Sequence, residues 1–149
     1  MDRVPDTTSF ETEPRPLSGS VVLVVDDDED IRTFLLALFA DHGAGLCEAA
    51  DGDEAMEMAR EKRPDIITLD LSMPGRDGVT TFSDLRADPL TADIPICVVT
   101  GHPEFRKVLY ERPVPAPEGF VTKPVNPDEL VRTVRRILAL RSRSRSRRR

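Results

Sequence analysis

The sequence predicts an α/β fold in which a five-stranded parallel sheet is covered by helices on both faces. Short apolar segments rich in β-branched residues alternate along the chain with longer segments whose apolar residues recur at helical spacing. The first short segment, residues 21–25, contains only Val and Leu, which is typical of a strand buried on both faces. Because connections between parallel strands are right-handed, this alternation restricts the topology to a few doubly wound arrangements.

Five strands and five helices are expected in alternation. The strands are predicted at residues 21–25, 45–49, 66–70, 94–100 and 120–122. The helices are predicted at about residues 31–42, 53–63, 79–87, 103–111 and from 127 onward. Apolar residues at helical spacing predict the inward faces of the first and last helices, namely Ile31, Phe34, Leu35, Leu38 and Phe39 in the first and Leu130, Val131, Val134, Ile137 and Leu138 in the last.

Proline limits the length of the fourth predicted helix. Pro103 precedes this helix, and three further prolines follow it within residues 113–117. Proline breaks a helix and disfavours helical backbone at the residue before it, so only about two turns fit, from Pro103 to near Glu111. The segment at residues 113–117 is predicted to be an extended connector.

The two ends of the chain differ from the middle. Residues 1–19 combine prolines with Ser, Thr and Glu, show no periodicity, and are expected to form a flexible leader. Residues 20–140 form the single predicted domain, which has enough apolar material for a core. Residues 141–149 alternate Arg and Ser before a final run of Arg. Apart from a brief continuation of the last helix, this basic tail is expected to be disordered, because like charges are dense.

Nothing in the sequence predicts export or membrane insertion. No segment approaches the roughly 18 apolar residues that cross a bilayer, and residues 1–20 lack the apolar centre of a signal peptide. We therefore expect a cytoplasmic protein. Cys47 and Cys97 lie within predicted strands, which favours reduced thiols over a disulfide.

Charge is unevenly distributed along the chain, whose net charge is -6. Residues 21–140 contain 23 acidic and 13 basic residues, whereas residues 141–149 contain six arginines and no acid. Because phosphate backbones bind cationic surfaces, the acidic domain itself is not expected to bind nucleic acid. Binding of nucleic acid or of an acidic partner is expected only through the tail, and a purely solubilising tail is the alternative.

Polar residues follow the predicted strands where each strand ends. Asp26 and Asp27 follow the first strand, Asp70 ends the third, Thr100 ends the fourth and Lys123 follows the fifth. In doubly wound sheets, ligands bind beyond the carboxyl ends of the strands, so we expect these side chains to gather at one edge. Each residue also has a purely structural interpretation: Asp26 and Asp27 as a solvated acidic loop, Asp70 as a turn cap, and Lys123 as a surface lysine. Their shared position at strand ends favours a functional site.

Three carboxylates at one edge of a sheet require a compensating cation. Two unit charges about 4 Å apart interact with about 4 kcal/mol at an effective dielectric constant near 20. All the candidate ligands are oxygens, and neither His nor Cys is expected at the same edge, so Mg²⁺ is favoured over zinc or copper. Since Mg²⁺ keeps coordination positions for phosphate oxygens, a phosphoryl group is the expected substrate fragment.

These residues belong to an ordered set of motifs. The set comprises Val24-Val25-Asp26-Asp27, the segment from Asp70 to Gly78 with the sequence DLSMPGRDG, Thr100-Gly101 and Lys123-Pro124. In this order and at these strand ends, the chain resembles bacterial two-component response regulator receiver domains of the single-domain, CheY-like type over about residues 20–140. The resemblance implies a flavodoxin-like sheet with the strand order 2-1-3-4-5 and a cis peptide bond before Pro124.

The resemblance also implies a chemical role for each carboxylate. Asp70 would receive a phosphoryl group from the phosphohistidine of a sensor histidine kinase or phosphotransfer protein. Asp27 and Asp70 would bind Mg²⁺ directly, Asp26 would bind it through water, and the backbone carbonyl of Ser72 would complete the protein ligands.

Three further residues would complete the reaction and its readout. Lys123 and the Thr100 hydroxyl would stabilise phosphoryl oxygens, since phosphoryl transfer needs mainly positioning and charge neutralisation. Thr100 would then move and leave a space into which the ring of Phe120 rotates, which converts a local charge event into a surface change.

The predicted function is therefore that of a signalling phosphoacceptor and not of an enzyme acting on other substrates. Output is expected through contact with a downstream protein that the sequence does not identify, and a homodimer is left open. The alternative is an adaptor that keeps the receiver fold without phosphorylation. A small Mg²⁺-dependent phosphatase would need a general acid two residues after the nucleophile, and Ser72 cannot serve as one.

Overall fold

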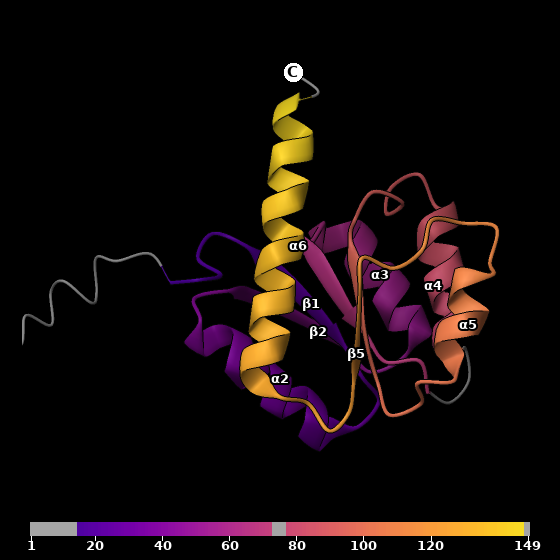
Figure 1. Ribbon diagram of the computed structural model, residues 1–149, viewed down its shortest axis with the longest axis horizontal. Coiled ribbons are helices and arrows are strands. Elements are labelled where there is room, and N and C mark those ends of the chain that lie inside the picture. Colours follow the sequence, from indigo (N-terminus) through magenta and orange to yellow (C-terminus); the bar gives the residue numbers. More distant parts are fainter. Residues whose placement is uncertain (1–14, 73–76, 148–149) are drawn as a thin grey trace, which may run out of the picture.

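The computed structural model describes residues 15–72 and 77–147 and contains a five-stranded parallel sheet (Figure 1). The strands are β1 (Val21–Val25), β2 (Gly45–Ala49), β3 (Ile66–Leu69), β4 (Ile96–Thr100) and β5 (Gly119–Thr122). Their order across the sheet is β2-β1-β3-β4-β5, and every neighbouring pair is parallel. The predicted fold class and strand order are confirmed.

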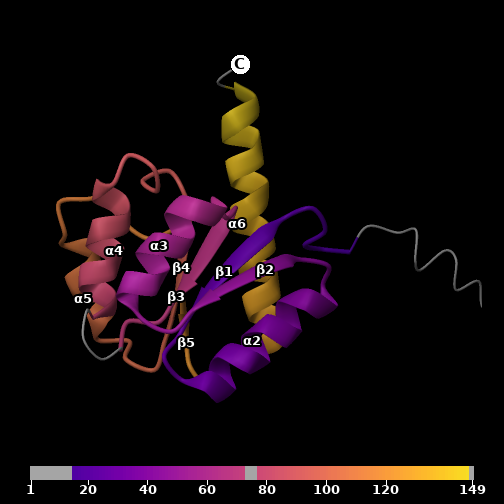
Figure 2. The ribbon, with the colours of Figure 1, turned by 180° about the vertical axis from the view of Figure 1, so that it is seen from behind.

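Five helices cover the two faces of the sheet. They are α2 (Glu29–Asp41), α3 (Gly52–Lys62), α4 (Gly78–Ala87), α5 (Phe105–Tyr110) and α6 (Pro127–Arg147). The helices α2 and α6 lie on one face, and α3, α4 and α5 lie on the other, as the two opposite views show (Figures 1 and 2). No helix in the described part of the chain is both long and apolar enough to cross a membrane.

The interior strand β1 contributes to two separate hydrophobic cores. Leu23 and Val25 face the core formed with α3, α4 and α5, whereas Val22 and Val24 face the core formed with α2 and α6. All four side chains are at most 2% exposed. This is why the strand carries an unbroken apolar run, because successive side chains point to opposite faces of the sheet and both faces are covered.

Aspartate side chains fix the start of three helices. Asp28 caps α2 by accepting from the amides of Asp30 and Ile31, and Asp51 and Asp77 cap α3 and α4 in the same way. Such caps satisfy amides that have no partner within the helix and typically stabilise it by about 1 kcal/mol. Within the acidic run after β1, Asp28 therefore serves as a helix cap. Asp26 and Asp27, which precede it, are the candidate site residues.

The predicted flexible leader is wrong for residues 15–19. These residues form a turn whose Leu17 side chain is 1% exposed and packs in the core between the sheet and α2 and α6. The Leu17 amide donates to the carbonyl of His42 at 2.9 Å, and Arg15 donates to the carbonyl of Asp41. The burial of Leu17 therefore anchors residues 15–19, although the composition of this segment is typical of a flexible one. Residues 1–14 lie outside the described part of the chain.

Two other expectations about helices are corrected by the structure. The basic tail is not disordered over residues 141–147, because α6 continues to Arg147. Arginine is a good helix former, and positive charge near the carboxyl end of a helix interacts favourably with the helix dipole. In α2, the predicted inward residue Phe34 is 46% exposed, because Leu35 and Phe39 occupy the core side of the helix.

The short fourth helix is confirmed, the connector after it contains no helix or strand, and one arginine holds this connector. The helix α5 spans only six residues. From α4, the buried Arg86 donates to the carbonyls of Pro115 and Ala116 in the connector, to the carbonyl of Ile94 and to the carboxylate of Glu118. Two of these hydrogen bonds hold the connector itself, and the other two fix the guanidinium, which explains how a segment without secondary structure keeps its path beside the sheet.

Gly78 is where α4 approaches the end of β3 most closely. Its amide donates to the carbonyl of Leu71 at 3.0 Å, and a Cβ added at this position would collide with the backbone of Asp70 and Leu71. Only glycine permits this approach. The Asp77-Gly78 pair therefore places the loop that follows Asp70, with the aspartate capping the helix and the glycine allowing the contact.

Replacing Gly78 by alanine should lower the free energy of unfolding by about 2 kcal/mol or more, because the colliding atoms are backbone and cannot rotate away. Urea denaturation measures this. Gly101→Ala is the matched control, since the nearest atom to its added Cβ is the Cβ of Lys123 at 4.0 Å, an ordinary contact. Equal stability of the two variants would contradict the packing described for Gly78.

Candidate functional site

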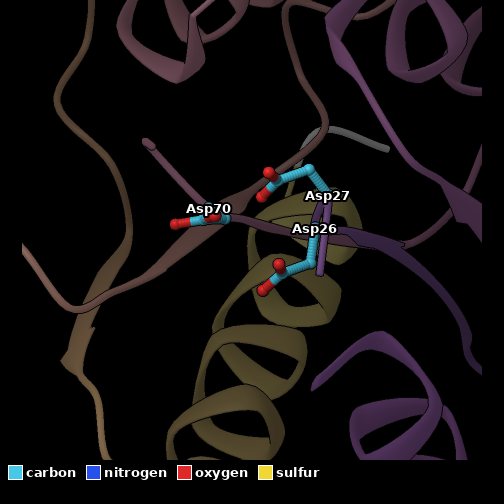
Figure 3. Close-up of side chains that lie close together, drawn as sticks. All are labelled: Asp26, Asp27 and Asp70. Atoms are coloured by element: carbon cyan, nitrogen blue, oxygen red, sulfur yellow. The ribbon is translucent and has the colours of Figure 1, made fainter. Parts of the chain in front are cut away.

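Three aspartates meet at the carboxyl edge of the sheet. Asp26 and Asp27 directly follow β1, and Asp70 directly follows the adjacent strand β3. Their carboxylates lie close together beyond the strand ends (Figure 3), with one oxygen of each within 4.8 Å of the others. The strand-end rule therefore predicted the position of this cluster correctly.

Asp26 is the most tightly held of the three. Its side chain is 1% exposed, its Oδ1 accepts from the amide of Asp28 at 3.0 Å, and its Oδ2 accepts from the Lys123 Nζ at 2.9 Å. Its backbone carbonyl accepts from Arg32 Nη1 at 2.8 Å. Both carboxylate oxygens of Asp26 are thus engaged within the protein, whereas Asp27 is exposed.

Among the described residues, Lys123 is the only lysine whose ammonium group lies at the aspartate cluster. It follows β5, its backbone amide donates to the carbonyl of Thr100 at 2.8 Å, and the peptide bond to Pro124 is cis. The Nζ lies 2.9 Å from Asp26 Oδ2 and 3.6 Å from Asp70 Oδ1. Lys123 therefore bridges the two buried carboxylates.

The environment of Asp70 disfavours its charged form. The residue is 4% exposed, and its Oδ1 accepts from the Ser72 amide at 3.3 Å. Burial raises the pKa of the Asp70 carboxyl from its ordinary value of 3.8 to about 6, while the Lys123 ammonium lowers this pKa and the Asp26 carboxylate raises it. Desolvation therefore outweighs the single nearby positive charge.

The balance of charge at this edge is negative. Three carboxylates share one ammonium, so the cluster carries an excess of two negative charges when all its groups are ionised. Carboxylate oxygens in this number fit a hard divalent cation. Asp27 and Asp70 offer oxygens that Lys123 does not hold tightly. The backbone carbonyl of Ser72, the other predicted ligand, belongs to the loop after β3, and the remaining motif residues 73–76 lie outside the described residues.

Thr100 ends β4 and is fully buried. Its Oγ1 accepts from the amide of His102 at 3.1 Å, so the hydroxyl is tied to the loop that leads into α5. The predicted switch residue Phe120 lies on the neighbouring strand β5, where its ring is partly buried against the core of α3, α4 and α5. It pairs in register with Val98, two residues before Thr100.

Sequence reasoning missed the arginines that support these residues. Arg32 holds the Asp26 carbonyl and also forms an ion pair with Glu48 at 2.9 Å. The Arg106 guanidinium lies over the rings of both Tyr110 and Phe120, at 5.3 and 5.7 Å from the ring centres. A basic residue one turn into the helix after the aspartates was a usable signal for Arg32. The role of Arg106 depends on which faces of α5 and β5 meet, which no local pattern encodes.

The chain is similar to known proteins over most of its length. The profile of the response regulator receiver domain matches residues 22–135. Protein Rrf1 of Nitratidesulfovibrio vulgaris is 36% identical over 118 residues, which cover 79% of this chain and 82% of Rrf1. The phosphate regulon transcriptional regulatory protein PhoB of Pseudomonas aeruginosa is 32% identical over 120 residues, which cover 80% of this chain. The chain spans only 52% of the length of PhoB.

Solved structures agree with these matches. The receiver domain of the sensor histidine kinase PA1611 from Pseudomonas aeruginosa is 26% identical, with a TM-score of 0.73 over 82% of this chain and 99% of that domain. In that structure, a magnesium ion is coordinated in the active site cleft.

In EDTA, replacing Asp70 by Asn should stabilise the protein above about pH 6 and have little effect below about pH 4. The pKa of Asp70 is raised in the folded state, so folding disfavours its charged form and the wild type loses stability as the pH rises through this interval. The asparagine variant has no such loss. Urea midpoints measured across this pH range test the difference.

The matched control is Asp93→Asn, which removes an exposed carboxylate before β4 and should change the midpoint by an amount that does not depend on this pH interval. An Asp70→Asn variant that is less stable than the wild type at neutral pH, in the absence of divalent ions, would contradict the electrostatic description of the site.

Proposed function

Because the chain belongs to the response regulator receiver domain family, we propose that it is a phosphoacceptor switch of two-component signalling in which Asp70 receives the phosphoryl group. The observation that carries this proposal is the arrangement of the buried Asp70 carboxylate at the edge of the sheet, with Lys123 at 3.6 Å and two further carboxylates beside it. The proposed donor is the phosphohistidine of a sensor histidine kinase or of a phosphotransfer protein.

Mg²⁺ is the proposed cofactor, and the donor set fits it. Asp27 and Asp70 would bind the ion directly, together with the backbone carbonyl of Ser72, and Asp26 would bind it through water. The ion pair of Asp26 with Lys123 at 2.9 Å supports this indirect role, because an oxygen held by an ammonium is a poorer metal ligand. When bound, the ion neutralises excess negative charge and orients phosphoryl oxygens.

The residues of this chain supply the rest of the transfer step. One Asp70 oxygen attacks the phosphorus atom, the bond between phosphorus and the donor imidazole nitrogen breaks, and the electron pair of that bond stays on the imidazole. Lys123 is placed to donate to a phosphoryl oxygen, since its Nζ already lies near Asp70 Oδ1. The Thr100 hydroxyl can donate to another oxygen after it turns toward the site.

The contacts of Thr100 and Phe120 suggest how the event reaches the surface. When the Thr100 hydroxyl turns toward a phosphoryl group, the His102 amide loses its acceptor at the entrance to α5. In the first turn of this short helix, the Arg106 guanidinium lies over the Phe120 ring. We propose that phosphorylation weakens two contacts, the hydrogen bond from the His102 amide to Thr100 and the contact of Arg106 with Phe120. The helix α5 and Phe120 would then move together and change the surface offered to a downstream protein.

Incubation with Mg²⁺ and acetyl phosphate should add the mass of one phosphoryl group to the intact wild-type protein. Asp70→Asn should remove the addition, because it replaces the proposed phosphoacceptor carboxylate by an amide, and EDTA should also prevent it. Asp93→Asn serves as the control and should be labelled like the wild type. Intact-protein mass spectrometry measures the product.

Equal labelling of Asp70→Asn would refute the assignment of the phosphoacceptor. Absence of labelling in the wild type would instead favour the alternative of an adaptor that keeps the receiver fold without phosphorylation.

Arg106→Ala should uncouple α5 from the site. Each contact between a guanidinium and an aromatic ring is typically worth about 0.5–1 kcal/mol at an exposed position, so their loss should raise hydrogen exchange in α5 several-fold before phosphorylation and reduce the further change on phosphorylation. Lys107→Ala is the control, because this residue is exposed on the same helix and is not stacked on either ring. An unchanged response in Arg106→Ala would show that the arginine is not part of the switch.

A further inference from the structure

The carboxyl end of α6 extends beyond the body of the domain. Over residues 127–143, where burial is described, the last buried residue of this helix is Ile137, and Leu140 is 56% exposed. Arg141 makes the last described contact, in which its Nη1 donates to the carbonyl of Asp65 at 2.6 Å. The yellow carboxyl end of the helix stands clear of the other elements in both views (Figures 1 and 2). The backbone continues as regular helix through residues 142–147, and Ser142 and Arg143 are exposed.

This projecting segment is dense in positive charge and contains no apolar residue. Residues 141–147 are only Arg and Ser in alternation. A helix rises about 1.5 Å per residue, so positive charges recur about every 3 Å along its axis. Duplex DNA carries one negative charge per roughly 1.7 Å of its axis. Like charges four residues apart on a helix repel each other, and the alternating sequence repeats arginine at this spacing, so a polyanion would relieve the repulsion.

We propose that the projecting end of α6 binds the phosphate backbone of duplex DNA without sequence preference. Arginine pairs with phosphate through two parallel hydrogen bonds, and serine hydroxyls donate to phosphate oxygens. A helix about 10–12 Å in diameter also fits the major groove of B-form DNA, which is about 12 Å wide, whereas the major groove of A-form RNA is too narrow.

The composition of the segment argues against other partners. Protein interfaces depend on buried aromatic or aliphatic anchors, and helices that lie in membrane surfaces need an apolar side. Residues 141–147 offer neither.

The position of the segment also fits DNA. Residues 21–140 carry a net charge of -10, which repels DNA from the body of the domain, but the end of α6 is held away from that body. The contact between Arg141 and Asp65, which precedes β3, places this end at the edge of the sheet opposite the aspartate cluster. DNA binding is therefore independent of phosphorylation at Asp70.

Fluorescence anisotropy with a labelled 20-base-pair duplex of arbitrary sequence tests the proposal with the full-length protein. The triple variant Arg143→Gln, Arg145→Gln and Arg147→Gln should bind at least tenfold more weakly than the wild type. The slope of log affinity against log salt should become shallower by about 2.7, the value for three phosphate contacts at about 0.9 each. Replacement of the same three residues by Lys should retain most of the binding and so excludes a mere loss of helix.

The matched control removes the same charge from the packed part of α6. Arg132, Arg135 and Arg136 are exposed on that part of the helix, and their replacement by Gln should weaken binding less than about threefold, since DNA held at the tip is farther away. Equal losses in the two triple variants, or no binding by the wild type at low salt, would overturn the proposal. Tighter binding to single-stranded RNA, to phosphatidylserine vesicles or to polyglutamate than to the duplex would also overturn it.

Discussion

The excess of negative charge at the carboxyl edge of the sheet is the constraint on which the site depends. Two buried carboxylates and one exposed carboxylate share a single ammonium, and burial makes the imbalance more severe than it would be in water. Lys123 offsets part of it by lying between Asp26 and Asp70. The remainder is what a divalent cation would neutralise.

The rest of the fold keeps these charges together despite their repulsion. The double burial of β1 fixes the point at which Asp26 and Asp27 leave the sheet, and Arg32 holds the Asp26 backbone from the following helix. On the other side, Gly78 allows α4 to contact the backbone directly after β3. Packing energy spread over two hydrophobic cores thus maintains a local arrangement that is unfavourable by itself.

Much of this arrangement follows from the sequence, because the rule about strand ends needs only the order of strands and the residues after them. Asp26, Asp27, Asp70 and Lys123 were placed correctly on that basis. The packing of Leu17 was not predictable, since one apolar residue in a proline-rich segment gives no periodic signal. Arg86 acts through carbonyl groups that only the folded connector brings together. The helical tail was misjudged because charge repulsion was weighed without the helix propensity of arginine. The structure fixes only positions, and the phosphoacceptor, ligand and switch roles stay predictions for every site residue, namely Asp26, Asp27, Asp70, Ser72, Thr100, Phe120 and Lys123.

Calorimetric titration of the full-length protein with Mg²⁺ tests the account of the aspartate cluster most directly. We expect one ion to bind per chain in the wild type and in Asp93→Asn, and binding to be lost or at least tenfold weaker in Asp27→Asn, which removes the exposed carboxylate without disturbing the pair of Asp26 and Lys123. Undiminished binding in Asp27→Asn, or no binding in the wild type, would contradict the claim that this charge excess forms a divalent cation site.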